Sequence, residues 1–203
     1  MSEPSLVLRH GPIDDQLPLE RPDRTGQVGV SLRLSTPALL LQAATWADGV
    51  DAWQAALSQA LSPVPARVGE TCATAAGLLM RVGPEELWIV DEDSPHSPAE
   101  RVAGLRAQLH AQIGSVLDLS HARVRLSVSG PRCMAMLSKL YALDFRDHAF
   151  PVGRVLLSGY HHVPCALHRT GQHAFDAYLF TTYARDQFET YVDAALEYGV
   201  RAA

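Results

Sequence analysis

Apolar and polar residues recur along the first third of the chain with periods that predict both strands and helices. From residue 28 to residue 34 the two kinds of residue alternate, which is the pattern of a strand with one buried face. A continuous apolar run over 38–44 predicts a second, buried strand. Apolar residues then recur at helical spacing over 50–61, so a helix is predicted to follow the second strand.

Two further apolar segments, 77–82 and 86–91, lie on either side of Gly83-Pro84. Glycine followed by proline is a turn signal, so the two segments are predicted to pair as a hairpin. Glu85 and Glu86 follow this turn, and we interpret their carboxylates as solvated groups at its tip.

The clearest helix start in the sequence is Ser97-Pro98-Ala99-Glu100. Ser97 can cap the helix, Pro98 suits its first turn, and the Glu100 carboxylate can reach back to complete a capping box. The helix is expected to end near residue 112, and 113–119 is expected to form another strand. Residues 38–119 therefore read β-α-β-β-α-β, the order of a ferredoxin-like fold.

The second half of the chain mixes strands and helices again. Residues 124–128 alternate like a strand that ends at Gly130-Pro131, and a short helix carrying Met134, Leu137 and Leu140 is predicted next. Strands are then predicted at 154–159, 163–168 and 174–180, followed by a helix over 184–195 that stops at Gly199.

These elements predict an α+β protein of two packed α/β subdomains with mainly antiparallel sheets. Residues 1–26 hold four prolines and no sustained period, so we expect an extended N-terminal arm that docks on the protein or stays mobile. Residues 27–119 are assigned to the ferredoxin-like βαββαβ subdomain, and residues 120–203 to a second α+β subdomain.

Composition excludes several classes of protein. The 203 residues carry a net charge of -5 without clustered lysine and arginine, which argues against nucleic-acid binding. The N-terminus lacks the pattern of a secretory signal, and the longest apolar run, 38–46, is too short to cross a bilayer, so we expect no membrane association and a cytoplasmic location. Three cysteines at unrelated spacings, Cys72, Cys133 and Cys165, are expected to be free thiols.

A metal site is considered at His161, His162, Cys165 and His168 and is not predicted. In a strand, residues 162 and 168 share one face while 161 and 165 share the other, so the four side chains cannot converge on one ion. We interpret them as hairpin or interface residues.

Catalytic chemistry is not predicted either. Asp118, Ser120 and His121 are the residue types of a hydrolase triad, but they lie too close in sequence, and we expect Asp118 and Ser120 to bond turn backbone. No glycine-rich dinucleotide or phosphate motif is present. Cys133 lies in a first helical turn, where the helix dipole can lower a thiol pKa, yet we favour a small buried thiol.

The tryptophans are assigned first to the core, although sequence alone leaves open that some anchor partner chains. They are Trp46, Trp53 and Trp88. Tryptophan, tyrosine and arginine dominate the energetics of protein interfaces, so both interpretations are physically reasonable.

Four segments together point to a known family. They are GP followed by ELWIV at 83–90, VLDLSHARVRLSVSGP at 116–131, LDFRDHAFPVGRV at 143–155, and AFDAYLFTTYARDQFETYVDAALEYG at 174–199. In these segments the chain resembles the gamma subunit of four-subunit sarcosine oxidase, over about residues 28–199. That family is in turn similar to the folate-binding fold of glycine-cleavage aminomethyltransferases, whose D-V-S-H pattern is echoed by Asp118-Leu119-Ser120-His121.

The resemblance implies an aminomethyltransferase-like fold and a non-catalytic gamma subunit within a heterotetrameric flavoenzyme. Such a complex demethylates sarcosine to glycine, with hydrogen peroxide and formaldehyde or methylenetetrahydrofolate as products. Its partners would be alpha, beta and delta subunits, and FAD, FMN, NAD and tetrahydrofolate would be held by them, with none in this chain. Arg123, Arg132, Phe150 and Pro151 are our candidates for the partner interface.

A stand-alone folate-binding, aminomethyltransferase-like module is the alternative. The relatives that act in tRNA modification and iron-sulfur maintenance carry a K-G-C-Y-x-G-Q-E motif, whereas Lys139 here is followed by Leu140-Tyr141-Ala142. The tandem His161-His162 and the proline-rich arm have no counterpart in the gamma-subunit pattern, so the N-methylated substrate of the complex stays open.

Overall fold

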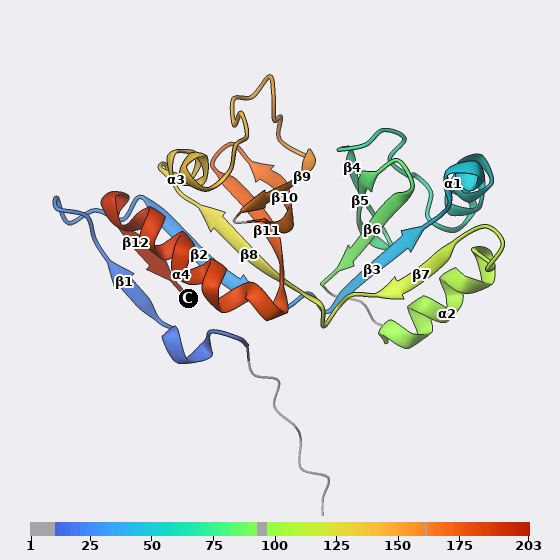
Figure 1. The fold of residues 1–203 in the computed structure, drawn as a ribbon, viewed down its shortest axis with the longest axis horizontal. Coiled ribbons are helices and arrows are strands. Elements are labelled where there is room, and N and C mark those ends of the chain that lie inside the picture. The colour runs from blue at the N-terminus through green and yellow to red at the C-terminus, as the bar shows by residue number, and fades with distance from the viewer. Residues whose placement is uncertain (1–10, 93–96, 161) are drawn as a thin grey trace, which may run out of the picture.

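The fold consists of two mainly antiparallel sheets with helices on their outer faces, which confirms the predicted α+β class (Figure 1). This computed structural model describes residues 11–92, 97–160 and 162–203. The four α-helices of these residues are α1 (Val50–Ala60), α2 (Pro98–Gln108), α3 (Cys133–Leu140) and α4 (Ala184–Ala195). None of the helices in this part of the chain is long and apolar enough to cross a membrane.

The smaller sheet has five strands. Their order is β4 (Thr71–Thr74), β5 (Gly77–Gly83), β6 (Glu86–Asp91), β3 (Leu39–Ala44) and β7 (Ser115–Asp118). Without β4, this is the predicted β-α-β-β-α-β unit, and β5 and β6 form the predicted hairpin. The prediction missed β4, an edge strand of four residues in which two threonines interrupt the apolar pattern.

Strands β3, β5 and β6 read as apolar runs because both faces of this sheet are covered. Leu39 and Leu41 pack with Trp53 and Leu57 of α1 on one face, whereas Leu40 lies on the other. The capping box of α2 is present as predicted: Ser97 Oγ accepts from the backbone N–H of Glu100 at 3.3 Å, and Glu100 Oε2 accepts from the backbone N–H of Ser97 at 2.8 Å. Helix α2 ends at Gln108, four residues earlier than expected.

The larger sheet has seven strands. Their order is β1 (Leu19–Arg21), β12 (Val200–Ala202), β2 (Val30–Ser35), β8 (Arg123–Ser129), β11 (Ala174–Phe180), β10 (Val163–Gly171) and β9 (Val155–Tyr160). Along β8, Val124, Leu126 and Val128 face a core shared with α3 and α4, and the polar residues between them face the other way. Gly199 ends the last helical segment with φ of 72°, as its predicted capping role requires.

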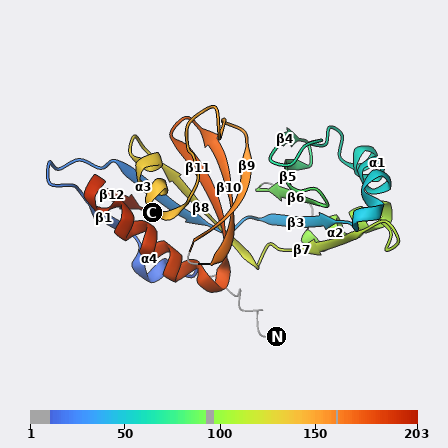
Figure 2. The ribbon, with the colours of Figure 1, turned by 45° about the horizontal axis from the view of Figure 1, so that its top comes forward.

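Strand β2 lies in the seven-stranded sheet, where it pairs with β8 and runs parallel to β12. Its residues therefore do not belong to the ferredoxin-like unit, as the 27–119 boundary predicted, although consecutive strands are commonly neighbours in space. Here the chain crosses from one sheet to the other between β2 and β3 (Figure 2).

The N-terminal arm docks on the seven-stranded sheet over the part that the structure describes. Ile13 is fully buried, and β1 adds an edge strand through antiparallel pairing of Leu19 with Ala202. Residues 1–10 of the predicted arm lie outside the described residues.

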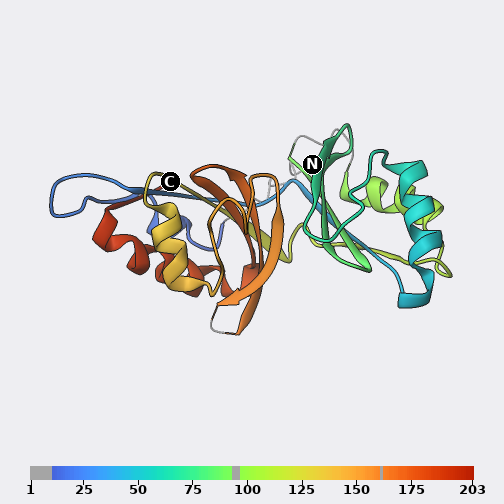
Figure 3. The ribbon, with the colours of Figure 1, turned by 90° about the horizontal axis from the view of Figure 1, so that it is seen from above.

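A third apolar cluster joins the two sheets. Leu40, Met80 and Trp88 of the smaller sheet meet Ala166 and Tyr178 of the larger one. Viewed from above, α3 and α4 lie at one end of the molecule and α1 and α2 at the other, with both sheets between them (Figure 3). The two sheets therefore meet through the faces that carry no helix.

Candidate functional site

The Cys165–His168 segment of β10 places its side chains on opposite faces of the sheet. Cys165 belongs to the core beneath the helices, whereas His168 lies on the helix-free face, 6% exposed. His162 is exposed in the preceding turn, and His161 lies outside the described residues. Across the ranges that the structure covers, no three His, Cys, Asp or Glu side chains group closely enough to hold a metal ion.

Asp118 and Ser120 both bond backbone groups, but only Asp118 bonds the turn itself, as predicted for both, whereas Ser120 bonds strand β3. Asp118 Oδ1 accepts from the backbone N–H of Ser120 at 2.9 Å, and Ser120 Oγ accepts from the backbone N–H of Leu40 at 2.9 Å. The side chain of Ser120 is buried, so the turn between β7 and β8 is fastened to β3. His121 is exposed beside it.

Of the two glutamates after the Gly83-Pro84 turn, Glu86 differs from the expectation of a solvated group. Glu86 Oε1 accepts hydrogen bonds from Gln42 Nε2 at 2.7 Å and from Trp88 Nε1 at 2.6 Å, and the residue is half-buried. Glu86 is the first residue of β6 and not part of the tip, so its side chain lies across β3.

The buried thiols and phenols are held in their protonated forms. Tyr141 Oη and Tyr191 Oη lie 2.5 Å apart, and Cys165 Sγ donates to Tyr141 Oη at 3.4 Å. Burial raises the pKa of both phenols and of Cys165. Burial also raises the pKa of Cys133, which is fully buried, and this confirms the buried-thiol interpretation. All three cysteines are free.

Sequence reasoning missed the buried arginine that organises the loop carrying part of the family resemblance. Arg169, 0% exposed, donates to the carbonyl oxygens of Phe150 at 2.6 Å and Gln172 at 3.0 Å. It also pairs with the Asp147 carboxylate at 2.7 Å. The sequence did contain a signal for this residue. Arg169 follows Cys165 and Leu167 on the inward face of the predicted strand, and a buried charge on that face requires partners.

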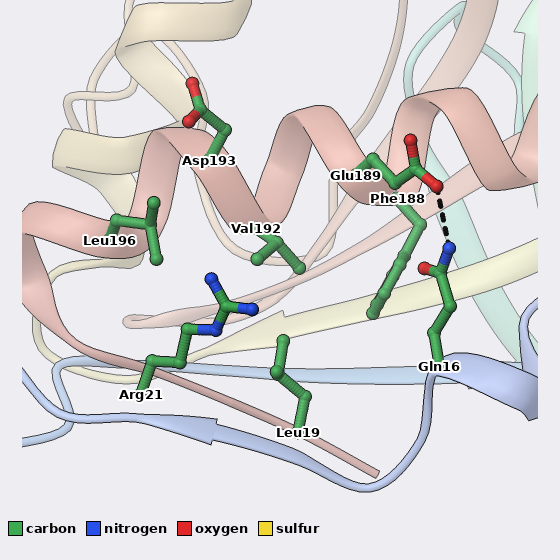
Figure 4. Close-up of a pocket in the computed structure, with 8 residues that line it drawn as sticks. All are labelled: Gln16, Leu19, Arg21, Phe188, Glu189, Val192, Asp193 and Leu196. Atoms are coloured by element: carbon green, nitrogen blue, oxygen red, sulfur yellow. Dashed lines mark hydrogen bonds between the residues drawn. The ribbon is translucent and has the colours of Figure 1, made fainter.

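A groove of about 430 Å³ lies between β1 and α4 (Figure 4). Leu19 and Arg21 rise from β1 towards the helix, and Phe188 and Val192 approach from α4. Gln16 closes one end by donating to Glu189 Oε1 at 2.7 Å. An apolar floor with a charged rim is typical of surfaces that contact other proteins.

The four predicted interface residues do not form one surface. Arg123 begins β8, whereas Arg132 follows its far end and precedes α3. Phe150 is 0% exposed and packs on Phe145 and Phe175, so its ring is not part of the surface of this chain, although the adjoining Pro151 is exposed. The carbonyl oxygen of Phe150 accepts from the buried Arg169, so both the ring and the backbone of Phe150 are held in the core.

Arg123 is the predicted residue with the most distinctive surroundings. Its guanidinium carbon lies 3.5 Å from the centre of the Phe180 ring and 5.1 Å from that of Trp88, at the seam between the sheets. Burial lowers the pKa of Arg123, but an arginine remains charged at any physiological pH.

Among the tryptophans, Trp53 and Trp88 are buried, as expected for the core. Trp46 is 54% exposed and differs from that expectation, because it lies beyond the end of β3 in the connection to α1. Other large apolar side chains with exposures of 49% or more are Val68, Leu117, Val152, Leu157 and Tyr183.

Comparison with known proteins places these features in a family. No protein-family model matches the sequence. The chain is 28% identical over 183 residues to the sarcosine oxidase subunit gamma of Corynebacterium sp. (strain U-96), covering 89% of this chain and 86% of that protein. It is 30% identical over 149 residues to the sarcosine oxidase subunit gamma of Arthrobacter sp., covering 72% and 71% of the two chains.

Solved structures share the fold. A chain of the heterotetrameric sarcosine oxidase from Corynebacterium sp. U-96, in complex with pyrrole 2-carboxylate, aligns with a TM-score of 0.75 and 24% identity over 94% of this chain and 96% of that one. The glycine cleavage system aminomethyltransferase T from Bartonella henselae aligns with a TM-score of 0.57 and 17% identity, covering 87% of this chain and 48% of that one. The predicted aminomethyltransferase-like architecture is therefore confirmed, and by its identity to the curated relatives along most of their length the chain belongs to the family of sarcosine oxidase gamma subunits.

Proposed function

We propose that this protein is the gamma subunit of a heterotetrameric, sarcosine oxidase-like flavoenzyme and that it contributes structure and not catalysis. The observation that carries the proposal is the match to gamma subunits along 86% and 71% of their lengths. Because the match spans most of each relative, it supports the same role for this chain as for the relatives. The complex would demethylate sarcosine to glycine, with hydrogen peroxide and formaldehyde or methylenetetrahydrofolate as the other products.

The chemistry of the described side chains supports an accessory role. The thiols of Cys133 and Cys165 and the phenols of Tyr141 and Tyr191 are buried, and their raised pKa values keep them protonated. A protonated thiol or phenol is a poor nucleophile or base. The polar groups of the Asp118–Ser120 turn are committed to backbone hydrogen bonds.

The cofactors of the complex belong, in this proposal, to the partner subunits. FAD, FMN, NAD and tetrahydrofolate would be held by alpha, beta and delta subunits, and the assembly would work in the cytoplasm. A permanent assembly commonly buries about 2,000 Å² or more in total, so this chain would present a broad face to its partners.

The test is to tag this chain in its native host and purify it gently. We expect three partner polypeptides of different sizes to co-purify in constant ratio. The preparation should be yellow and show flavin absorption bands. Sarcosine should reduce those bands, and the isolated chain should neither absorb in the visible nor oxidise sarcosine. Flavin bound to the isolated chain, or turnover by it, would contradict the non-catalytic role.

A stand-alone folate-binding module is the second candidate, favoured by the shared fold of the aminomethyltransferase. Its signature would be a colourless single chain whose melting temperature rises with added folate. The accessory-subunit proposal expects no such rise for the isolated chain. The two candidates are therefore separated by one purification and one thermal scan.

A further inference from the structure

The guanidinium of Arg123 is fixed in place at the seam between the two sheets. Its guanidinium carbon lies 3.5 Å from the centre of the Phe180 ring of β11 and 5.1 Å from that of the Trp88 ring of β6. Two aromatic rings restrict both the position and the orientation of a planar cation. The group is therefore preorganised before any partner arrives.

No carboxylate of the described residues pairs with this cation. Its Nη1 lies 3.5 Å from the carbonyl oxygens of Pro164 and Tyr178, at the outer limit of a hydrogen bond, and its buried Nε has no partner. The nearby carboxylate of Glu86 already accepts from Gln42 and Trp88. An arginine has five N–H donors, so much of the hydrogen-bonding capacity of Arg123 is unused.

Two other arginines of the same sheet behave differently. Arg125, two residues along β8 on the same face, pairs with Glu92 at 2.7 Å, and the buried Arg169 pairs with Asp147 at 2.7 Å. Of these three arginines, only Arg123 is held by aromatic rings without an ion pair to a carboxylate of the described residues. Its surroundings supply dispersion and cation–π contacts, and the nearby Glu86 carboxylate acts on it only at a distance, without an ion pair.

Apolar side chains extend the same face away from Arg123. Arg123 pairs in register with Phe180. On the same helix-free side of the sheet, Pro164 lies two residues before Ala166 on β10, and Leu157 of β9 pairs with Ala166. Leu157 is 54% exposed, and Pro164 is exposed as well. We name these four residues, Arg123, Leu157, Pro164 and Phe180, the Arg123 platform.

We propose that the Arg123 platform is the docking site for a segment of a partner subunit that carries an Asp or Glu carboxylate flanked by apolar side chains. The inference rests on the proposed function, which supplies the partner subunits. The carboxylate would accept charge-assisted hydrogen bonds from the guanidinium, and the apolar flanks would cover Leu157 and Pro164. Rigid arginine and aromatic groups beside exposed apolar area are the composition of interface hot spots.

The first test uses the tagged complex in a host that makes no untagged copy. Arg123→Gln removes the charge, and we expect it to weaken partner recovery across a dilution series by about tenfold or more. Arg201→Gln is the matched control, because Arg201 lies on β12 in an exposed ion pair with Glu20, and a change below about fivefold is expected. Equal recovery for Arg123→Gln and wild type would overturn the docking site.

A second measurement does not depend on how Arg123→Gln folds. A photoreactive benzoylphenylalanine in place of the exposed Leu157 should crosslink a partner subunit, and mass spectrometry should find an Asp or Glu within a few residues of the crosslink. A crosslinked peptide without an acidic residue, or no crosslink in a complex that otherwise assembles, would overturn the docking site and leave the proposed function standing. If the wild-type chain recovers no partner at all, the proposed function falls and the docking site falls with it.

Discussion

Arg169 shows how one buried charge shapes a surface loop. Its guanidinium reaches the carbonyl oxygens of Phe145 and Phe150, so both ends of the 145–150 segment are tied to β10. The aromatic rings of that segment then pack on Phe175. The loop is ordered by hydrogen bonds to its backbone, and its sequence alone gives no periodic signal for that order.

Replacing Arg169 by methionine should lower the free energy of unfolding by about 3 kcal/mol, because several buried carbonyl groups would lose their donor. The matched variant Asp147→Asn removes the other partner of the ion pair, whose side chain is 77% exposed, and should cost no more than about 1 kcal/mol. Urea unfolding followed by circular dichroism measures both values. Equal costs would show that the ion pair, and not the backbone contacts, carries the stabilisation.

His168 makes stability depend on pH. Burial on the helix-free face lowers the pKa of His168 below 6.5, although the Asp176 carboxylate across the strand pair opposes the shift. In the unfolded chain the same imidazole takes up a proton near pH 6.5. The unfolded state therefore binds more protons below that pH, and the free energy of unfolding must fall as the pH drops from about 6.5 towards the lowered pKa.

We expect His168→Gln to flatten this dependence, measured as the difference in melting temperature between pH 5 and pH 8. His121→Gln, at an exposed histidine of the β7–β8 turn, should leave the difference unchanged. A wild-type difference that persists in His168→Gln would assign the pH dependence to other groups.

At the scale of elements, helix α2 combines a strong local signal with weak packing. Leu105 is the one buried residue of α2, so the capping box contributes much of the stability at the start of this helix. Ser97→Ala should destabilise the protein by about 1 kcal/mol, since the first-turn N–H of Glu100 loses its acceptor.

Ser58→Ala is the matched control for the cap. Ser58 lies on the exposed side of α1, where its hydroxyl donates back to the Gln54 carbonyl oxygen, and alanine has the higher helix propensity. Chemical denaturation should therefore show Ser58→Ala to be neutral or slightly stabilising. A loss equal to that of Ser97→Ala would mean that serine removal, and not the cap, is responsible.

At the scale of the whole molecule, we expect the inter-sheet cluster to make the two halves one cooperative unit. Leu40 and Leu41 are adjacent on β3 and both fully buried, but Leu40 faces the larger sheet and Leu41 faces the helices of the smaller one. This pair separates the coupling between the sheets from the stability of one sheet.

Either leucine changed to alanine should cost about 2–5 kcal/mol. In Leu41→Ala, the free energy of unfolding measured by tryptophan fluorescence and the one measured by hydrogen exchange of β8 and β10 should fall by the same amount, because the sheets are expected to unfold as one. In Leu40→Ala the two probes should separate, since the cavity lies between the sheets. Unchanged exchange protection of β8 and β10 in Leu41→Ala would contradict the coupling.

Local patterns determined much of this protein. The alternation in β8, the apolar runs of β3, β5 and β6, the turn at Gly83-Pro84 and the capping box of α2 depend on neighbouring residues, so each was predicted from sequence. The resemblance carried by four segments gave the family, which identity to the curated relatives confirmed.

Tertiary structure alone decided which sheet each strand joins. Strands β1, β4 and β12 have only three or four residues and form because a distant strand offers its edge, a contact that no local period encodes. The same holds for side chains: Phe150 is buried against Phe145 and Phe175, and Arg123 meets Trp88 only because two sheets converge there. A sequence specifies local conformation through adjacent residues, whereas burial and pairing depend on groups that folding brings together from far along the chain.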